Sequence, residues 1–536
     1  MSHRKMWAPG WRDRIWSSMD KQWDIVVVGG GITGAGILNE AAKAGLRVLL
    51  LDKGDFASGT SSRSSKLVHG GLRYLRNGQL RTTVSSVHER ERLLREGRGL
   101  VTPLGFLFAN YEGDRTPRWA LGLGLAVYDI LGMRWGHKYY DAAGALKLAP
   151  NLASEGLQGG YRYFDAQTDD ARLVLRVIYE GVSAGGTALN YAQVENLLIS
   201  RDGRVRGVAL RDLAPEGYGR TTEIQSGIVV NAAGASADVF RQQIGSDNRL
   251  RFLKGSHLLF NSDRFPINRA ISFSHPVDQR PVFALPWEGV TLFGTTDVEH
   301  TAHPNLEPSI SAAELDYLLV GAAYAFPSLH LAQEDVQATF SGIRSVVGTG
   351  ENSPSKESRE HIIWFEKGLL TVSGGKLTTF RVMARHALRS IRRYLPGRPK
   401  FDSPRVLDEP GVISGSIQLE PVDRARLAGR YGAEALTFID SALPGELTHV
   451  DDAHNCRSLW AELRWAARCE GIVHLEDLLL RRVRIGLLLP QGGLPWMDRI
   501  RAITQGELGW NDERWERELQ EYCSLWSDVF FLPPEY

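Results

Sequence analysis

The clearest pattern of apolar and polar positions is a short apolar run that leads into a glycine-rich turn. Residues 25–28 are all β-branched and apolar, which is typical of a parallel strand buried on both faces. Gly29-x-Gly31-x-x-Gly34 follows directly, then a helical stretch that Gly45 ends, then a second apolar strand, "RVLLLD". We therefore predict a strand, turn, helix and strand at this point of the chain.

Two further apolar runs lead into small residues and then a helical pattern. One begins at Gly227 ("GIVVNAAGASADVF") and the other at Gly368 ("GLLTVSGGKLTTFRVMARHAL"). Three such segments predict one parallel sheet assembled from distant parts of the chain, with ligands at the carboxyl ends of its strands. Residues 93–165 and 253–337 carry short aromatic strands instead, so we expect a second sheet inserted into the first domain.

The last part of the chain has a different pattern. Four prolines between residues 395 and 416 indicate a linker, and a charged helical region follows it. Within the second sheet region, Ser311 and Glu314 predict a capping box ahead of a helix that stops at Pro327. The apolar run that begins at Trp119 is too short for a transmembrane helix and contains an aspartate, so we interpret it as a buried helix.

The N-terminus carries an apolar stripe with cations between its members. The apolar positions, four residues apart, are Trp7, Trp11, Ile15, Met19 and Trp23, and the cations are Arg4, Lys5, Arg12 and Arg14. Such a stripe is typical of a helix that lies in a membrane interface. An arm packed on its own protein or on a partner subunit would show the same pattern, and Pro9 and Gly10 would interrupt a single helix. Both interpretations stay open.

Composition narrows the class of protein. With 536 residues, two or three domains are expected, and a net charge of +1 gives no support for a nucleic-acid binder that works by neutralising phosphates. Cys456, Cys469 and Cys523 have neither metal-ligand spacing nor a disulfide framework, which favours a reducing compartment. The N-terminus has no apolar core of a signal peptide.

The first glycine turn predicts a dinucleotide site. Its glycines permit a tight turn and a close approach to a pyrophosphate, and Asp52 at the end of the next strand can accept hydrogen bonds from a ribose. The segment "GTSSRSSKLVHGGLRYL" follows, and residues 56–88 contain no acidic residue. A second turn, Gly374-Gly375-Lys376, is no Walker A loop but can stabilise negative charge as a helix start. Segments this far apart indicate a long cofactor, which favours FAD over NAD.

Five motifs in order, "HGGLRYL", "GTTDVEH", "SGIRSVVG", "SKESREH" and "GLLTVSGGKLTTFR", resemble those of the FAD-dependent glycerol-3-phosphate dehydrogenases. The resemblance covers residues 24–384 well and the helical tail more loosely. The tryptophan-rich N-terminal extension precedes it, and Asp52 stands where glutamate is more usual in this superfamily.

The resemblance implies an α/β fold. It has a Rossmann-like FAD-binding domain of the glutathione-reductase and glycine-oxidase type, an inserted antiparallel-sheet substrate domain and a C-terminal helical domain. We predict these boundaries: an amphipathic extension at 1–22; the FAD-binding domain at 23–92, 166–252 and 338–395; the substrate domain at 93–165 and 253–337; a linker at 396–416; and the helical domain at 417–536.

The resemblance also implies oxidation of sn-glycerol 3-phosphate to dihydroxyacetone phosphate, with hydride transfer from C2 to N5 of FAD. We expect Arg73 and Arg344 to clamp the phosphate or the C2 oxygen, and His257 or His69 to be the base. Further predicted substrate contacts are Tyr74, Thr296 and Lys376. The predicted cofactor-binding residues are Gly29, Gly31, Ile32, Thr33, Gly34, Asp52, Lys53, Thr60, Ser61, Ser62, Ser65, Lys66, His69, Gly70, Gly71, Val194, Ala233, Gly234, Gly375, Lys376, Leu377 and Thr378.

For partners, the resemblance implies a membrane quinone as electron acceptor and peripheral attachment to the cytoplasmic face of the inner membrane. It leaves a homodimer open, and we expect no nucleic acid. We expect no metal, because Pro304 and the lack of a carboxylate partner argue against His300 and His303 as ligands. Alternative functions are a glycerol-3-phosphate oxidase that uses O₂, a related amine or hydroxy-acid flavoenzyme, and a non-catalytic flavin-binding membrane subunit.

Overall fold

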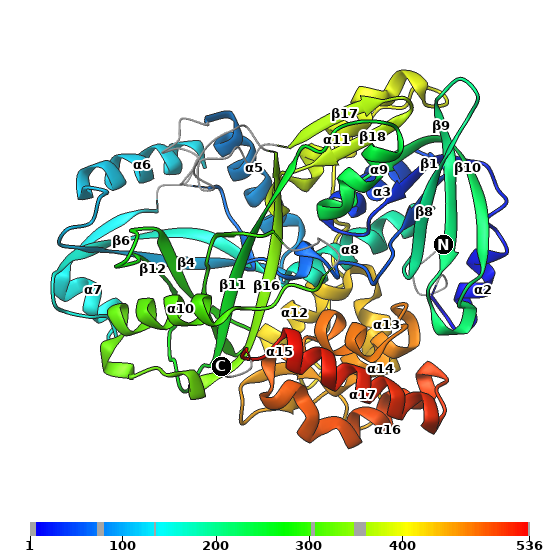
Figure 1. Ribbon diagram of the computed structural model, residues 1–536. Coiled ribbons are helices and arrows are strands. Elements are labelled where there is room, and N and C mark those ends of the chain that lie inside the picture. Colours follow the sequence, from blue (N-terminus) through cyan, green and yellow to red (C-terminus); the bar gives the residue numbers. More distant parts are fainter. Residues whose placement is uncertain (1–6, 72–79, 133–135, 302–305, 348–360, 534–536) are drawn as a thin grey trace.

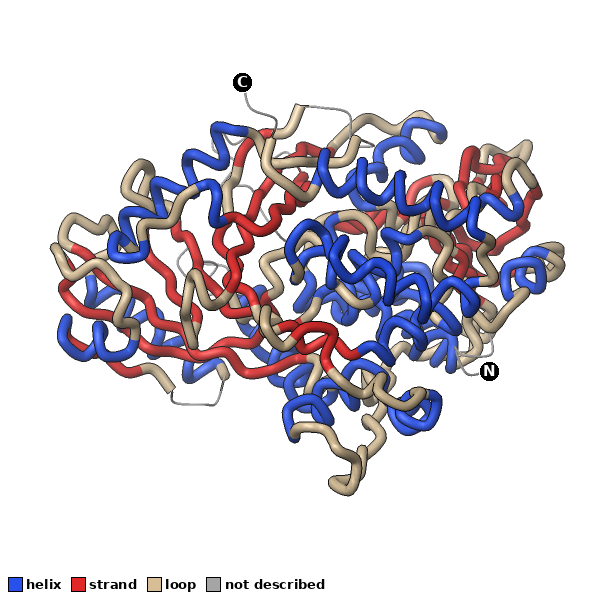
Figure 2. The backbone as a smooth tube through the Cα atoms, turned by 90° about the horizontal axis from the view of Figure 1, so that it is seen from below, coloured by secondary structure: helices blue, strands red, loops and turns tan. Residues whose placement is uncertain are grey.

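The computed structural model describes residues 7–71, 80–132, 136–301, 306–347 and 361–533 of the chain. Figure 1 shows a helix-covered sheet at the upper right, a larger sheet at the left and a group of helices below both. Seen from below, the strands form two groups with helices between them (Figure 2). The site must therefore be sought where these parts meet.

The first sheet contains eight of the described strands, on the path β17–β18–β10–β1–β2–β7 with β8 and β9 to one side. β1 (Trp23–Val28) is parallel to β10 (Thr221–Asn231) and to β2 (Val48–Leu51), and β18 (Leu369–Ser373) is parallel to β10. The prediction of one parallel sheet from three distant segments is confirmed. The other strands are β7 (Thr187–Leu189), β8 (Ala192–Ile199), β9 (Val205–Asp212) and β17 (Ile362–Glu366).

Both faces of this sheet are buried, as the continuous apolar run of β1 predicts. Ile25 and Val27 pack with the helices of one face, and Val26 and Val28 pack toward β8 and β9 on the other. The helices are α3 (Ile32–Lys43), α8 (Asp170–Ser183) and α11 (Phe380–Ile391), with α9 (Ala237–Gln243) after β10.

The second sheet contains ten described strands, in the order β15–β11–β14–β13–β12–β4–β6–β3, with β16 beside β11 and β5 beside β6. Its described strand pairs are antiparallel apart from β12 with β4. The strands are β3 (Leu67–Val68), β4 (Val101–Tyr111), β5 (Lys138–Asp141), β6 (Leu157–Thr168), β11 (Leu250–Asn261), β12 (Ala270–Ser274), β13 (Pro281–Trp287), β14 (Val290–Gly294), β15 (Val298–Glu299) and β16 (Val336–Val347).

This larger sheet separates two layers. α10 (Ala312–Ala325), with the predicted capping box of Ser311 and Glu314, covers one face. The opposite face packs on the C-terminal helices. β3 and most of β16 come from segments assigned above to the cofactor domain, but both strands belong to this larger sheet. The exact domain boundaries stay a prediction.

Other described helices are α2 (Trp11–Trp16), α5 (Leu80–Glu96), α6 (Arg118–Leu131) and α7 (Ala142–Leu148). The C-terminal part contains α12 (Pro421–Tyr431), α13 (Ala435–Ser441), α14 (Trp460–Cys469), α15 (Ile485–Leu488), α16 (Met497–Leu508) and α17 (Asp512–Val529), with β19 (His449–Asp451) and β20 (Cys456–Leu459). A π-helical turn, Asp477–Arg482, lies between α14 and α15. From this turn Arg481 and Arg482 bind the buried Asp55, which follows β2.

The N-terminal apolar stripe packs on the chain itself. Trp7 is only 2% exposed, and Ile15 and Met19 lie in the core with β8 and β9. Arg12, which the membrane interpretation needs at a lipid surface, is buried in an ion pair with Asp212. Of the two interpretations left open, the structure favours the packed arm.

Helix α6 corrects the prediction of a buried helix. Leu121 and Leu125 pack toward β4 and β6, but Trp119, Leu123 and Ile130 on the other side are 71%, 61% and 65% exposed. The three exposed residues are four and seven positions apart, so they form one stripe along the helix. Only one side of this helix meets the sheet, and its apolar sequence covers both sides.

Candidate active site

Close approaches of the backbone explain the glycines of the first turn. A Cβ atom on Gly29 would lie 2.4 Å from the carbonyl oxygen of Ala232, and one on Gly34 would lie 1.9 Å from that of Gly29. A Cβ on Gly31 would instead approach Ser61, whose Oγ accepts the amide hydrogen of Ile32 at 3.0 Å. The first turn of α3, with Ile32 and Thr33, thus presents its amides beside Ser61, as a pyrophosphate site requires.

Asp52 lies at the end of β2, against the same turn. Its Oδ2 accepts from the amide of Gly30 at 2.6 Å and its Oδ1 from the amide of Gly54 at 2.9 Å. Burial raises the pKa of Asp52 to about 6, although these two hydrogen bonds lower it. Each carboxylate oxygen has a further lone pair, so the predicted ribose contact fits this geometry.

The end of β10 lies against the first glycine turn. The Cα atom of Ala233 is 3.0 Å from the Cβ position of Gly29, and Gly234 has a φ of +57°. Two other predicted cofactor residues lie in different surroundings. Val194 lies in β8 with its side chain in a hydrophobic core, and Lys53 is exposed next to Asp52.

The segment 59–71 runs between the two sheets. Thr60 donates its hydroxyl hydrogen to the carbonyl of Ile343 in β16, and Ser65 Oγ lies 2.9 Å from Nε2 of His257 in β11. Farther along, the amide of His69 donates to Thr378 Oγ1 at 3.2 Å. The segment therefore contacts the first glycine turn, the larger sheet and the second glycine turn, as expected of a segment that lies between cofactor and substrate.

Glycines 70 and 71 complete this segment. The amide of Gly70 donates to Tyr128 Oη at 2.8 Å, and a Cβ there would come within 2.3 Å of the same atom. Gly71 has a φ of +81°. Arg73 and Tyr74, which follow, lie outside the described residues, as does His303.

Lys66 does not fit the cofactor-binding role predicted for its charge. Its Nζ lies 2.8 and 2.9 Å from the two oxygens of Asp170, and the side chain is 1% exposed. Burial, and then the charge of Arg484, lowers the pKa of Lys66 to about 7. The cation is paired inside the protein, whereas Ser61 remains beside the first turn.

The second glycine turn reaches the same region. Gly375 has a φ of +81°, and Leu377–Thr379 form a 3-10 turn before α11 begins at Phe380. Thr378 exchanges hydrogen bonds with the backbone of His69. Lys376 lies before this turn, with Nζ 3.3 Å from Ser86 Oγ. Its assignment to cofactor or substrate stays a prediction.

Arg344 lies on the face of β16 that carries the site. Its Nη1 donates to Asp297 Oδ1 at 3.0 Å and its Nη2 to Thr295 Oγ1 at 3.2 Å. The guanidinium extends across Gly255, where a Cβ would lie 2.4 Å from Nη2. The side chain retains 27% exposure. Gly255 is therefore the residue that leaves room for the guanidinium.

Thr296 faces the other way, which does not fit its predicted contact with substrate. Its Oγ1 donates to Glu314 Oε1 at 2.7 Å and accepts from the amide of Ser256 at 2.8 Å. Although burial raises it, hydrogen bonds from Lys254, Thr296 and Ser256 bring the pKa of Glu314 below its ordinary value. Thr295, one position earlier, contacts Arg344 instead. Both threonines lie between β14 and β15, and the sequence does not show which of them the backbone turns toward Arg344.

His257 is the buried histidine of the site. Its ring stacks on Phe340 with centroids 4.7 Å apart, and Nε2 contacts Ser65. Nδ1 is buried and has no hydrogen-bond partner in the part of the chain that the structure describes. Burial, and then the charges of Arg344 and Lys66, lowers the pKa of His257 well below its ordinary value. The ring is therefore neutral at pH 7 and able to accept a proton.

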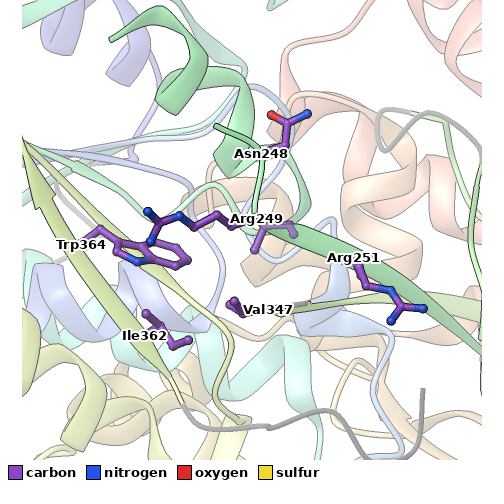
Figure 3. A pocket seen from close by; sticks show the side chains of 7 residues that line it. Asn248, Arg249, Arg251, Val347, Ile362 and Trp364 are labelled. Carbon is purple, nitrogen blue, oxygen red and sulfur yellow. The ribbon is translucent and has the colours of Figure 1, made fainter. Parts of the chain in front are cut away.

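A separate cavity of about 550 Å³ opens where β11 begins and β16 ends, beside β17 (Figure 3). It is lined by Asn248, Arg249, Leu250, Arg251, Val347, Ile362 and Trp364. The guanidinium of Arg249 lies 5.3 Å from the centre of the Trp364 ring. None of the predicted site residues lines this cavity. The candidate site is therefore the region around His257 and Arg344, where the segment 59–71 meets β11 and β16.

Comparisons with known proteins bear on the family and the fold of this chain. The family model described as FAD dependent oxidoreductase matches residues 24–388. The model described as the C-terminal domain of alpha-glycerophosphate oxidase matches residues 373–515. The two matches together span both sheets and most of the C-terminal helices.

Individual relatives are similar along most of the chain. The aerobic glycerol-3-phosphate dehydrogenase of Bacillus subtilis (strain 168) is 36% identical over 423 residues, covering 76% of this chain and 75% of that protein. The X-ray structure of the glycerol-3-phosphate dehydrogenase from Bacillus halodurans complexed with FAD has a TM-score of 0.76 at 28% identity and covers 98% of both chains. The L-alpha-glycerophosphate oxidase from Mycoplasma pneumoniae, with FAD bound, has a TM-score of 0.57 at 16% identity. It covers 71% of this chain and 96% of that one, which is a likeness of fold alone.

Proposed function

The chain belongs to the FAD-dependent glycerol-3-phosphate dehydrogenase family, and from that premise we propose that it passes the electrons from glycerol 3-phosphate to a membrane quinone. The enzyme is an FAD-dependent oxidoreductase that acts on glycerol 3-phosphate. The proposal concerns the acceptor, the residues that perform the reaction and the place where it occurs.

The residues around the first turn fit FAD. The amides at the start of α3, the carboxylate of Asp52 and the hydroxyls of Ser61 and Ser65 offer donors and acceptors to a dinucleotide. When bound, FAD supplies the acceptor for the hydride that leaves C2 of the substrate. The chain's own residues must bind the phosphate, orient C2 and remove the hydroxyl proton.

One observation carries the assignment of the site: His257 and Arg344 share one face of the β11–β16 pair. Arg344 lies opposite Leu253, and residues 253, 255 and 257 point to the same side of β11. That side faces the segment 59–71 through Ser65, which contacts His257. An anion clamp and a neutral base thus face the cofactor segment together.

In the proposed reaction, Nδ1 of His257 takes the proton of the C2 hydroxyl. The atom is buried, has no partner among the described residues and belongs to a ring whose pKa is lowered. Arg344 binds the phosphate or the C2 oxygen through the planar fork that suits such oxygens. Arg73 and Lys376 are proposed as further cations for the phosphate dianion.

Anaerobic reduction of the flavin tests this assignment. Purified holoenzyme is mixed with glycerol 3-phosphate or with glycerol, and the loss of flavin absorbance is followed. We expect reduction by the phosphorylated polyol alone, because the cations proposed for the site, Arg344, Arg73 and Lys376, bind the phosphate. Equal reduction by glycerol would contradict a phosphate clamp.

The acceptor is tested separately, since an oxidase shares the fold. With the flavin reduced by glycerol 3-phosphate, we expect rapid reoxidation by a soluble quinone analogue and slow reoxidation by O₂. Stoichiometric peroxide without quinone would instead favour the oxidase, the second candidate function.

We further propose that the enzyme attaches peripherally to the cytoplasmic face of the inner membrane, through α6. Among the described helices, none is long and apolar enough to cross a membrane. The exposed stripe of Trp119, Leu123 and Ile130 offers apolar side chains to a lipid interface. Arg118 and Lys138 beside it are exposed, which suits anionic headgroups.

A further inference from the structure

A cluster of buried charges lies where the C-terminal part meets residues 62–66. Asp170 accepts hydrogen bonds from Lys66 Nζ, from Ser64 Oγ at 2.7 Å and from Arg484 Nη2 at 2.8 Å. Asp170, Lys66 and Arg484 are each at most 1% exposed. Because these charges are satisfied by one another, the cluster holds protein segments together rather than a ligand.

Arg484 is the contribution of the C-terminal part. It follows the π-helical turn, and its guanidinium also donates to the carbonyl of Ser62 at 3.1 Å and to that of Leu480 at 2.7 Å. Its Nε lies 3.4 Å from Asp169 Oδ1. One side chain thus ties the end of the chain to both the cofactor segment and the start of α8.

The cluster fixes both neighbours of Ser65. The amide and the hydroxyl of Ser64 both bind Asp170, and the amide of Lys66 donates to Ser64 Oγ at 3.1 Å. Lys66 has a φ of +61°, a conformation that residues other than glycine rarely adopt. Ser65 is therefore held between two restrained residues, with its Oγ 2.9 Å from His257 Nε2.

This contact determines which nitrogen of His257 is available. A neutral imidazole carries its proton on one ring nitrogen and a lone pair on the other. When Ser65 Oγ accepts the Nε2 hydrogen, the lone pair lies on Nδ1, the atom without a described partner. A hydroxyl that donated to Nε2 would leave a hydrogen on Nδ1, which could not take a proton.

We propose that Arg484, Asp170 and Lys66 are positioning residues for His257: they hold Ser65 so that its Oγ accepts the Nε2 hydrogen and the lone pair of Nδ1 faces the substrate hydroxyl. The inference rests on the proposed function, in which His257 is the base. It gives the C-terminal part a role in the reaction, although none of its described residues is among the predicted site residues.

A double-mutant cycle tests the coupling, with Arg484→Met, Ser65→Ala and the double variant as holoenzymes in a dye-linked assay. We expect each single change to lower kcat/KM about 10- to 100-fold. We expect the double variant to be no slower than Ser65→Ala, because Arg484 acts through Ser65. Arg484→Lys should recover part of the loss, and Arg468→Met, in the same domain but outside the cluster, should cause none. Multiplicative losses in the double variant would overturn the proposal.

Hydrogen exchange of peptides from residues 60–71 supplies a readout that does not depend on turnover. Faster exchange in Arg484→Met or Arg484→Lys, but not in Arg468→Met, would support the anchoring of the segment. Unchanged exchange would overturn the inference whichever residue is the base. Full activity of His257→Asn would show that His257 is not the base and would contradict the proposed function. The exchange result would still decide whether Arg484 holds the segment. If Arg484→Met does not fold, Arg484→Lys and Ser65→Ala carry both measurements.

Discussion

Lys66 and Arg344 are two cations that border the same site, and the structure gives them different tasks. Lys66 is 1% exposed and lies between both oxygens of Asp170, whereas Arg344 keeps 27% of its side chain exposed beside Asp297. Removing a buried cation that is paired with carboxylates destabilises the chain, because the carboxylates are left buried without compensation. A cation can bind a ligand only where part of it remains accessible. We call a side chain committed where it is buried and paired within the protein, and accessible where part of it reaches solvent. The contrast between the two kinds leads to four predictions.

The largest effect is expected from the accessible cation. Arg344→Ala should lower kcat/KM for glycerol 3-phosphate about 1,000-fold or more while FAD stays bound, because a charge-assisted contact in the transition state is lost. Dye-linked kinetics and the flavin spectrum measure the two quantities. Arg249→Ala, in the nearby cavity outside the site, is the matched control. Near-normal turnover of Arg344→Ala would remove Arg344 from the site.

Arg12 is a buried, paired cation away from the site, so its loss should affect stability and leave the chemistry unchanged. Arg12→Met leaves Asp212 buried with Arg220 as its remaining partner, which should cost about 3 kcal/mol of stability. The melting temperature of the holoenzyme should fall, with unchanged kcat/KM for the folded fraction. Arg14→Met, an exposed neighbour on α2, should have no such effect. If both variants melt like the wild type, the N-terminal arm is not packed as described.

The pH profile sharpens the comparison, because both cations act on His257. Burial, and then Arg344 and Lys66, lowers the pKa of His257, so the base stays unprotonated and the acid limb of kcat/KM should lie well below pH 6.5. In Arg344→Met the lost positive charge should raise that pKa and move the limb upward. The substrate phosphate titrates identically in both variants, so the difference reports the enzyme. A limb that does not move would contradict the proximity of Arg344 to His257.

The smallest effect is expected from the apolar stripe of α6, which is exposed, whereas the N-terminal stripe is packed on the chain itself. Replacing Trp119, Leu123 and Ile130 by serine should weaken binding to anionic liposomes about tenfold without loss of dye-linked activity. The control replaces exposed apolar residues elsewhere, Tyr218, Val277 and Val412. Equal partitioning of both variants in a flotation assay would contradict attachment through α6.

The parts that were predicted correctly are local in sequence. The apolar strand, glycine turn, helix and second strand ending at Asp52 fall within residues 23–52, and each element follows from its neighbours. The capping box of Ser311 and Glu314 was recognised for the same reason. Even the parallel sheet from three segments required only that each repeat the same strand-to-helix pattern.

The parts that were not predicted depend on distant partners. Asp170 lies 104 positions from Lys66 and 314 from Arg484, so nothing near Lys66 indicates that its charge is already paired. One signal was available: "LLLRRVRIGLLL" places three arginines in an apolar run, and buried charges require partners. For α6, the sequence showed two apolar sides but not which of them meets the sheet.

The contacts of Arg481 and Arg482 with Asp55 also bear on how the protein is made. Asp55 and Arg482 are 427 positions apart, so a ribosome exposes the carboxylate long before it adds the guanidinium groups that bind it. A nascent chain that ends before the π-helical turn cannot close the loop after β2 in this way. We therefore expect flavin to be captured only after synthesis is almost complete, as the last step of assembly.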